Sequence, residues 1–537
     1  MSFTSHQVTF KEAGFSSLIT DYVSANPALA DYFAFSPDKK SLTKAIESRK
    51  NYHVNREVLV NSLLKQYEAT VFNSDWKSSP VFQNIQQLGK SETFTVTTGH
   101  QLNIFTGPLY FVFKILTAVR QAEELKKMFP ENHFVPVYWM ATEDHDLEEI
   151  KSVNVAGEKI TWQTNQMGAT GRMNTQGFKE TLRLILKKFS ASKNEVFIRS
   201  ILETAYLKNN TLANATRSMV HELFSEYGIV VLDADDPVLK RQAIPVFKDD
   251  LQNHTAFKEF KNLESFEKKY GLQVHAREIN LFYLQPDSRE RITKNGDGSY
   301  EVVSTNIRFS PEELFRELEK SPERFSPNVI LRPVYQEMIL PNLCYTGGPA
   351  EVHYWLQLKK IFEHNKVFFP IIALRNCMMV ADSINSKTLT SLKLNWKDIF
   401  DDVNVIANKY IREKYSDKLD LGEAYHQLEL AYKHIKEKAS AIDITLAKHA
   451  DAEQVRLKKR LAATEKRMLR ALKKKNETDV QTIQQLKDSL FPGGNLQERT
   501  ENVFPFIAEY GKVFFDDLLK VMDIFPQNFQ VLSFDSK

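Results

Sequence analysis

Reactive side chains follow five short apolar segments of this sequence, at the points where those segments end. The segments are 94–98, 134–140, 228–232, 328–331 and 367–374. The residues that follow them are Gly99, His100, Gln101, Glu143, Asp144, Asp146, Asp233, Asp235, Asp236, Arg332, Gln336 and Arg375. If the segments are parallel strands, their carboxyl ends meet at one sheet edge, where α/β proteins bind ligands. A single charge after a strand usually marks a solvated loop, so the prediction depends on five such strands sharing an edge.

These residue types suit acid–base chemistry on an anionic small molecule. His100, Glu143 and Asp144 carry groups that transfer protons. Arg332 and Arg375 can each hold a carboxylate through two parallel hydrogen bonds. Carboxylates at the same edge would also suit the ammonium group of a substrate.

Two further segments place a glycine before a proline at the start of a predicted helix. One reads FTGPLY (105–110) and the other YTGGPAE (345–351). Glycine lets a ligand approach the backbone, and a helix N-terminus offers free N–H groups. Both segments are candidate sites for a carboxylate or phosphate, although helix capping alone also explains them. The residues involved are Thr106, Gly107, Tyr110, Tyr345, Gly347, Gly348 and Glu351.

A candidate nucleotide site lies near the C-terminus, where 491–499 reads FPGGNLQER. Two glycines after a proline can form a backbone nest for phosphate. We expect an adenine nucleotide, ATP or ADP, to bind there, with an aromatic ring against the base. The residues are Gly493, Gly494, Asn495, Phe506 and Tyr510. A turn that only ends a helix is the alternative, and the sequence contains no G-x-G-x-x-G motif.

Metal-ligating residue types are present, but their spacing matches no zinc motif. They include His100, Asp144, Asp146 and His353. We therefore expect no metal apart from Mg²⁺ that accompanies a nucleotide. A metal-dependent hydrolase of a sugar or amide substrate remains an alternative function.

The elements that position these residues predict an α/β protein of several domains. The chain has 537 residues, of which 42% are hydrophobic and 26% charged, and this length exceeds what one core normally supports. Strands that alternate with helices indicate a mostly parallel sheet. Hairpins at 151–165 and around Asn295–Gly298 interrupt the pattern, the second at a strong turn signal. We predict a core over 1–415 with insertions at about 151–225 and 240–325.

A helical region follows the core. Residues 423–491 contain neither glycine nor proline, and apolar residues recur every seven positions at Leu421, Leu428, Ile435 and Ile442. This spacing is typical of a coiled coil, with a break near Asn476, where Thr478 and Gln481 would form a capping box. We predict a coiled-coil domain at 420–490 that forms a homodimer, or an intramolecular helix hairpin, and a segment at 491–537 that packs on the core.

Charge and cysteine content bear on partners and compartment. The net charge is +3, but residues 451–475 contain ten Lys/Arg and three acids. A nucleic-acid-binding coiled coil is therefore a further alternative, although the run lacks aromatic residues for base stacking, so we expect no nucleic-acid partner. Two cysteines, no apolar signal core and no long apolar run predict a cytoplasmic protein without a membrane partner.

Four motifs in this order resemble the BshC family, to which the cysteine-adding step of bacillithiol biosynthesis is attributed. They are 98–110 (TGHQLNIFTGPLY), 139–146 (WMATEDHD), 332–336 (RPVYQ) with 345–351 (YTGGPAE), and 490–499 (LFPGGNLQER). The resemblance runs from about residue 90 to the C-terminus.

The resemblance implies a Rossmann-like core with two connecting-peptide insertions, a coiled-coil domain that supports a homodimer, and a ligase. The implied reaction joins L-cysteine to the glucosamine amine of glucosaminyl-malate, giving bacillithiol in the last pathway step. Because amide formation requires an activated carboxylate, ATP is the expected driver. His100 and Gln101 would then orient the activated acyl group, and Glu143, Asp144 or Asp146 would serve as base. Arg332 and Arg375 would clamp substrate carboxylates.

Overall fold

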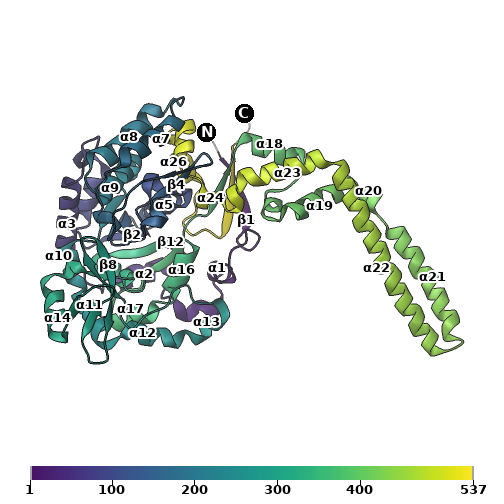
Figure 1. Ribbon diagram of the computed structural model, residues 1–537, viewed down its shortest axis with the longest axis horizontal. Helices are drawn as coiled ribbons and strands as arrows, with labels where there is room; N and C mark the ends of the chain where they lie inside the picture. The colour runs from purple at the N-terminus through teal and green to yellow at the C-terminus, as the bar shows by residue number, and fades with distance from the viewer. Residues whose placement is uncertain (1–2, 535–537) are drawn as a thin grey trace. The chain divides into compact units, whose positions relative to one another are not determined.

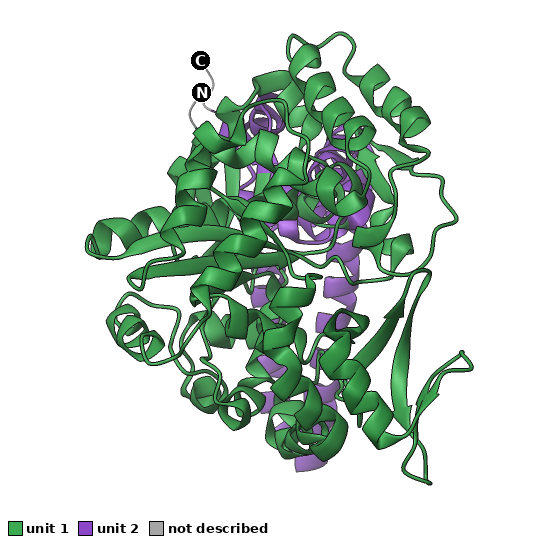
Figure 2. Cartoon of the chain, turned by 90° about the vertical axis from the view of Figure 1, so that its left-hand side faces the viewer, with its two compact units in different colours: residues 1–379, 495–532 green, residues 380–494, 533–537 purple. Residues whose placement is uncertain are grey.

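The computed structural model describes residues 3–534. Two compact units make up this part of the chain (Figure 2). One contains residues 3–379 and 495–532, and the other contains residues 380–494 and 533–534. The candidate active site described below lies wholly within the first unit.

A five-stranded parallel sheet forms the centre of the first unit (Figure 1). Its strand order is β13 (Ile371–Leu374), β12 (Asn342–Gly347), β2 (Thr93–His100), β3 (His133–Met140) and β6 (Val230–Asp233). Every neighbouring pair is parallel, so all five carboxyl ends lie at one edge. The prediction of a Rossmann-like, mostly parallel α/β core is confirmed.

Helix α5 (Leu109–Met128) packs against β2 and β3 and covers part of the sheet. Its residues Ala118, Ala122 and Leu125 recur at helical spacing, so they share one face. They join a buried cluster that also contains Phe94 from β2 and Phe134 from β3. This packing fixes α5 beside the edge where β2 ends.

One predicted strand is wrong. Residues 328–331 form a turn, because the Asn328 side chain accepts hydrogen bonds from the N–H groups of Ile330 and Leu331, at 2.8 and 3.3 Å. Such local bonds compete with strand formation. Arg332 and Gln336 therefore lie on helix α15 (Arg332–Ile339), and β12 supplies the fifth strand of the sheet.

Both predicted hairpins are confirmed. Strands β4 (Ser152–Val155) and β5 (Glu158–Thr161) pair antiparallel. The other hairpin belongs to a second five-stranded sheet, in which β8 and β9 are joined by a turn at Asn295–Gly298. The strands of this second sheet are β7 (Leu281–Gln285), β8 (Ser288–Lys294), β9 (Tyr300–Val302), β10 (Arg308–Phe309) and β11 (Phe325–Pro327).

Long helices dominate the second unit, as expected for a coiled-coil domain. They are α21 (Gly422–Ser440), α22 (Ile444–Lys475) and α23 (Glu477–Leu490). Helices α21 and α22 lie side by side as a hairpin (Figure 1). The helices that carry the heptad pattern therefore pack on each other within one chain. The break at Asn476 is confirmed, but the capping box is wrong because Thr478 lies inside α23, whose N-cap is Asn476.

No helix within residues 3–534 combines the length and the apolar character that a membrane span requires.

Candidate active site

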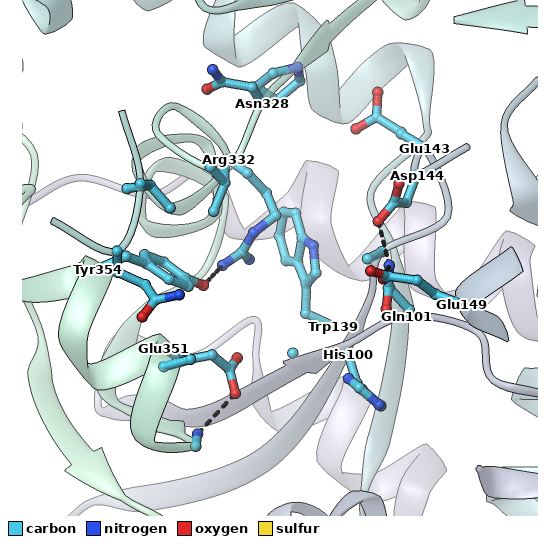
Figure 3. A pocket seen from close by; sticks show the side chains of 18 of the residues that line it. His100, Gln101, Trp139, Glu143, Asp144, Glu149, Asn328, Arg332, Glu351 and Tyr354 are labelled. Atoms are coloured by element: carbon cyan, nitrogen blue, oxygen red, sulfur yellow. Dashed lines mark hydrogen bonds between the residues drawn. The ribbon is translucent and has the colours of Figure 1, made fainter. Parts of the chain in front are cut away.

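A cavity of about 990 Å³ lies where β2, β3 and β12 end (Figure 3). Its walls also include α15, α16 (Pro349–Leu356) and the second sheet. The predicted residues that line it are Gly99, His100, Gln101, Tyr110, Glu143, Asp144, Arg332, Tyr345, Gly348, Glu351 and Arg375. Among the residues predicted at this sheet edge and at the two helix starts, those outside its lining are Thr106, Gly107, Asp146, Asp233, Asp235, Asp236, Gln336 and Gly347. Most of the predicted residues therefore lie together at one edge of the sheet.

His100 lies at the end of β2. Its ring packs edge-to-face on Tyr110 with centroids 5.2 Å apart. Burial, with smaller contributions from Lys114 and Arg375, holds the pKa of His100 well below its usual value. Within residues 3–534 its Nε2 atom has no hydrogen-bond partner. This nitrogen is therefore a buried polar atom that the chain leaves unsatisfied.

Two carboxylates share the side chain of Gln101. Its Nε2 atom donates to Asp144 Oδ2 and to Glu149 Oε2, both at 2.7 Å (Figure 3). Glu149 lies on α6 (Leu147–Ile150) and was not predicted from the sequence. Neither carboxylate pairs with a Lys or Arg side chain in the described part of the chain. Together they form an anionic patch that suits an ammonium group.

Glu143 belongs instead to a buried ion-pair network. Its Oε1 atom lies 2.5 Å from Lys240 Nζ, and Lys240 also contacts Asp235 at 3.0 Å. Burial alone would raise the pKa of Asp235, but Lys240 and Arg172 hold it at about 2. Since Glu143 is committed to Lys240, Asp144 is the better placed general base.

Arg332 faces the cavity without a carboxylate partner. Its Nη2 atom donates to the hydroxyl of Tyr354 at 3.1 Å (Figure 3). Its Nη1 atom donates to Gln336 Oε1 at 3.0 Å. The guanidinium also lies 5.9 Å from the ring centre of Trp139. Gln336 is buried and bonds to Glu337 at 2.7 Å, so it positions Arg332 rather than contacting a ligand.

The predicted carboxylate clamp at Arg375 needs correction. Its two terminal nitrogens donate to the carboxylate of Glu498 at 2.8 and 2.7 Å. Both side chains are almost fully buried, at 2% and 0% exposed. Because Glu498 occupies the guanidinium fork, Arg375 cannot hold a substrate carboxylate in the same way. The sequence motif around Glu498 therefore serves the core of the first unit.

Glu351 is also committed within the chain. Its Oε2 atom accepts from the N–H of Gly348 at 2.8 Å and pairs with Lys114, while its Oε1 atom accepts from Tyr345 at 2.6 Å. Lys114 donates in turn to the carbonyl of Gly99 at 2.5 Å. The N–H of Gly348, the N-cap residue of α16, is thus occupied, which weakens the prediction of an anion site at this helix start. Lys114 was missed, although a lone lysine in the apolar run 109–119 is the signal that could have found it.

The other predicted anion site, at the start of α5, is a strained turn. Phe105, Thr106 and Gly107 all have positive φ values, of 51°, 70° and 63°. Asn502 donates to the carbonyls of Phe105 and Gly107, both at 2.7 Å. The first N–H of α5 donates to the Glu501 carbonyl at 2.7 Å. These contacts account for the glycine and proline without a ligand.

The residues of the predicted nucleotide site have mixed surroundings. Gly493 and Gly494 both have positive φ values, of 63° and 78°, and a Cβ at either would meet nothing within 4 Å. The N–H of Gly494 donates to the carbonyl of Phe491 at 2.8 Å, so it is already used within the turn, and Asn495 beside it is exposed. Phe506 and Tyr510 stack on Phe514, with ring centres 5.0 and 6.3 Å apart. The adenine site remains a prediction.

The residues considered as metal ligands do not converge. Asp146 caps α6 by accepting from the N–H of Glu149 at 3.3 Å, and His353 bonds to the carbonyl of Gly271 at 3.1 Å. In the described residues no group of three or more His, Cys, Asp or Glu side chains is arranged to hold a metal ion. This geometry gives no support to the metal-dependent hydrolase.

Comparison with known proteins identifies the family. Residues 3–376 match the model of the N-terminal Rossmann-like domain of BshC from bacillithiol biosynthesis, and residues 378–534 match that of its C-terminal coiled-coil domain. A Flavobacterium johnsoniae protein named "Putative cysteine ligase BshC" is 39% identical over 98% of this chain and 99% of its own length. Proteins of the same name from Christiangramia forsetii and Flavobacterium psychrophilum are each 38% identical, over 97% of both chains and over 94% and 95% respectively. With both domain models matched in order across nearly all of its length, the chain belongs to the BshC family.

Proposed function

We propose that this protein is a ligase that joins the carboxyl group of L-cysteine to the glucosamine amine of glucosaminyl-malate in the cytoplasm, forming bacillithiol in the last step of its synthesis. The charge pattern of the cavity carries the proposal. The unpaired carboxylates Asp144 and Glu149 suit the ammonium groups of the two substrates. The unpaired guanidinium of Arg332 suits a carboxylate. Membership of the BshC family supports the same reaction.

Asp144 is assigned as the general base. The substrate ammonium group must lose a proton before the nitrogen lone pair can attack the acyl carbon of cysteine, and Asp144 accepts that proton. Gln101 holds the carboxylate in place through its 2.7 Å hydrogen bond. His100, whose side chain lines the cavity, would orient the reacting acyl group. The new C–N bond forms as the activating group leaves with the electron pair of the broken bond.

ATP is the proposed energy source, because a free carboxylate does not form an amide spontaneously. When bound, the nucleotide would supply the phosphoryl or adenylyl group that activates the carboxylate of cysteine. The exposed turn at Gly493 and Gly494 is the candidate phosphate contact, on the sequence argument that consecutive glycines can form a phosphate nest. No step above depends on whether the nucleotide binds there.

The direct test is mass spectrometry of the full-length protein incubated with L-cysteine, glucosaminyl-malate and ATP. The proposal expects a product whose mass equals that of bacillithiol and whose formation requires all three components. Omission of ATP alone provides the control for the energy source. Failure to form the thiol with a folded protein and all components present would refute the assigned reaction.

We also propose a homodimer formed through α21 and α22. Five large apolar side chains on or beside this hairpin remain 43–79% exposed: Leu430, Ile435, Ile442, Ile444 and Leu446. Such a row needs a partner surface, and a second copy supplies the same row.

The dimer is tested by light scattering of the double variant Ile435→Asp and Ile442→Asp. We expect this variant to be monomeric, because the charges would enter an apolar interface. Val196→Asp is the matched control, since Val196 is 75% exposed in the first unit. A double variant with the mass of the wild type would refute this interface.

A further inference from the structure

Several arginines in the cavity wall have no carboxylate partner. Lys114 and Arg375 are neutralised by Glu351 and Glu498. Among residues 3–534, no carboxylate forms an ion pair with the remaining arginines that line the cavity. These are Arg277, Arg289, Arg291, Arg332 and Arg499. Three of them, Arg277, Arg289 and Arg291, come from the second insertion, to which no function has been assigned above.

Arg289 on β8 is held rigidly. Its Nε atom donates to Ser326 Oγ at 2.9 Å and its Nη2 atom to the Pro327 carbonyl at 3.1 Å. Its Nη1 atom lies 3.2 Å from His145 Nδ1. Because a guanidinium only donates, this imidazole nitrogen is the acceptor. The guanidinium also lies 4.0 Å from the ring centre of Phe282.

Some N–H groups of Arg289 have no hydrogen-bond partner in the described residues. A guanidinium has five N–H groups, and the chain uses three of those on Arg289. The other two have no acceptor in the described residues. Burial lowers the pKa of Arg289, opposed only by the more distant charges of Glu143, Asp144 and Asp235. Arg289 is partly exposed at the cavity, and its two free N–H groups and unpaired charge suit an anion there.

A second cation, Arg291, lies beside Arg289 on the same strand. Arg289 and Arg291 are two residues apart on β8, so both project from the same face. Arg291 pairs across the strands with Phe282, and Phe282 pairs with Ser326 on the other side. Arg277 lies in the loop before β7, where its N–H donates to the side chain of Asn280 at 3.0 Å.

We propose that this face of the second sheet is an oxyanion-binding subsite of the cavity, centred on Arg289 with Arg291 beside it. It binds a carboxylate or phosphate group of a small-molecule ligand. Two sources of this chemistry exist, a substrate carboxylate and a nucleotide phosphate. The choice of probes rests on the proposed function, but the subsite itself rests on the unpaired arginines.

Calorimetric titration of L-malate and of ADP into the full-length protein tests the subsite without turnover, so a failed ligase assay would leave the result intact. For Arg289→Gln we expect binding of one probe to weaken by about 10- to 100-fold, as loss of charge-assisted hydrogen bonds predicts. Weaker malate binding identifies the carboxylate, and weaker ADP binding identifies the phosphate. Arg308→Gln, an exposed position on β10 of the same sheet, is the matched control.

Thermal melting separates this subsite from a structural brace. Without ligand, Arg289→Gln should melt near the wild-type temperature, because removal of an unpaired charge offsets the loss of the three hydrogen bonds of Arg289. A lower melting temperature with unchanged binding of both probes would show that Arg289 only braces the sheet and would overturn the proposal. Unchanged affinity of the folded variant, or a wild type that binds neither probe, would also overturn it. If Arg289→Gln does not fold, Arg291→Gln carries the same comparison, because no side-chain hydrogen bond of Arg291 is broken by the change.

Discussion

Charged side chains form ion pairs in one part of the cavity wall and have no ionic partner in another part. In the buried part, ionised groups are paired within the chain, as in Arg375 with Glu498, whose side chains are 2% and 0% exposed. In the open part, Asp144 is 34% exposed and has no Lys or Arg partner among the described residues. Arg332 likewise has only neutral hydrogen-bond partners.

The difference separates residues that build the site from residues that can act in it. Removing one member of a buried pair leaves an isolated charge, which is strongly destabilising. An unpaired group at the cavity contributes little to folding and has its interactions still available for a ligand. Substitutions in the buried part should therefore lower stability more than activity, and substitutions in the open part should lower activity more than stability.

The largest effect on stability is expected for Glu498→Ala. This change leaves the Arg375 guanidinium buried without a counter-charge, so the free energy of unfolding should fall by about 3–5 kcal/mol. Urea denaturation measures this loss. The double variant Glu498→Leu with Arg375→Leu is the control and should recover much of it, because no charge is left unpaired. A loss of less than about 1 kcal/mol, as for an exposed ion pair, would show that this pair does not stabilise the fold as a buried ion pair does.

The largest effect on activity is expected for Asp144→Asn. Loss of the general base should lower kcat/KM for thiol formation by about 10²-fold or more, while the melting temperature stays near that of the wild type. Asp146→Asn is the matched control. Because asparagine also caps helices well, this variant should keep both activity and stability. Equal losses of activity in the two variants would contradict the assignment of Asp144.

His221 should affect stability alone, since it lies outside the cavity. Burial lowers its pKa from 6.5 to about 4, and it is fully buried beside Tyr67 and Phe72. The unfolded chain therefore binds a proton that the folded chain excludes, so stability is complete above pH 6.5 and falls as the pH drops towards 4. Linkage gives a loss of up to about 3 kcal/mol across this window.

The comparison of His221→Phe with the wild type isolates this contribution. Denaturation at pH 7 and at pH 4.5 should show a smaller acid-induced loss in the variant, because phenylalanine can occupy the same aromatic environment without titrating. Thiol formation at pH 7 should be unchanged. A variant with the same acid sensitivity as the wild type would show that other groups cause it.

The sequence predicted the positions of the cavity residues better than their partners. Strand periodicity located His100 and Asp144, because residues that follow parallel strands must share an edge. It could not reveal that Glu498, more than a hundred residues after Arg375, would bind that arginine, since pairing across the chain depends on tertiary packing. The false strand at 328–331 has a local cause, the side-chain hydrogen bonds of Asn328, which hydrophobicity does not encode.

The roles of lysines were the hardest to predict. Lys240 and Lys114 are both buried, and each neutralises a glutamate that otherwise had the residue type expected of a catalytic acid or base. Their sequence surroundings differ, because Lys114 interrupts an apolar helix whereas Lys240 ends the short helix α10 (Pro237–Lys240). Only the apolar context of Lys114 distinguishes it from a solvated lysine.

Parallel measurement of activity and melting temperature for Arg332→Gln tests the central claim most directly. If unpaired charges at the cavity serve the ligand, KM for glucosaminyl-malate should rise by about 10- to 100-fold. The melting temperature without ligand should equal or exceed that of the wild type. A lower melting temperature with unchanged KM would show that Arg332 supports the fold, and it would contradict the division of the cavity wall into paired and unpaired parts.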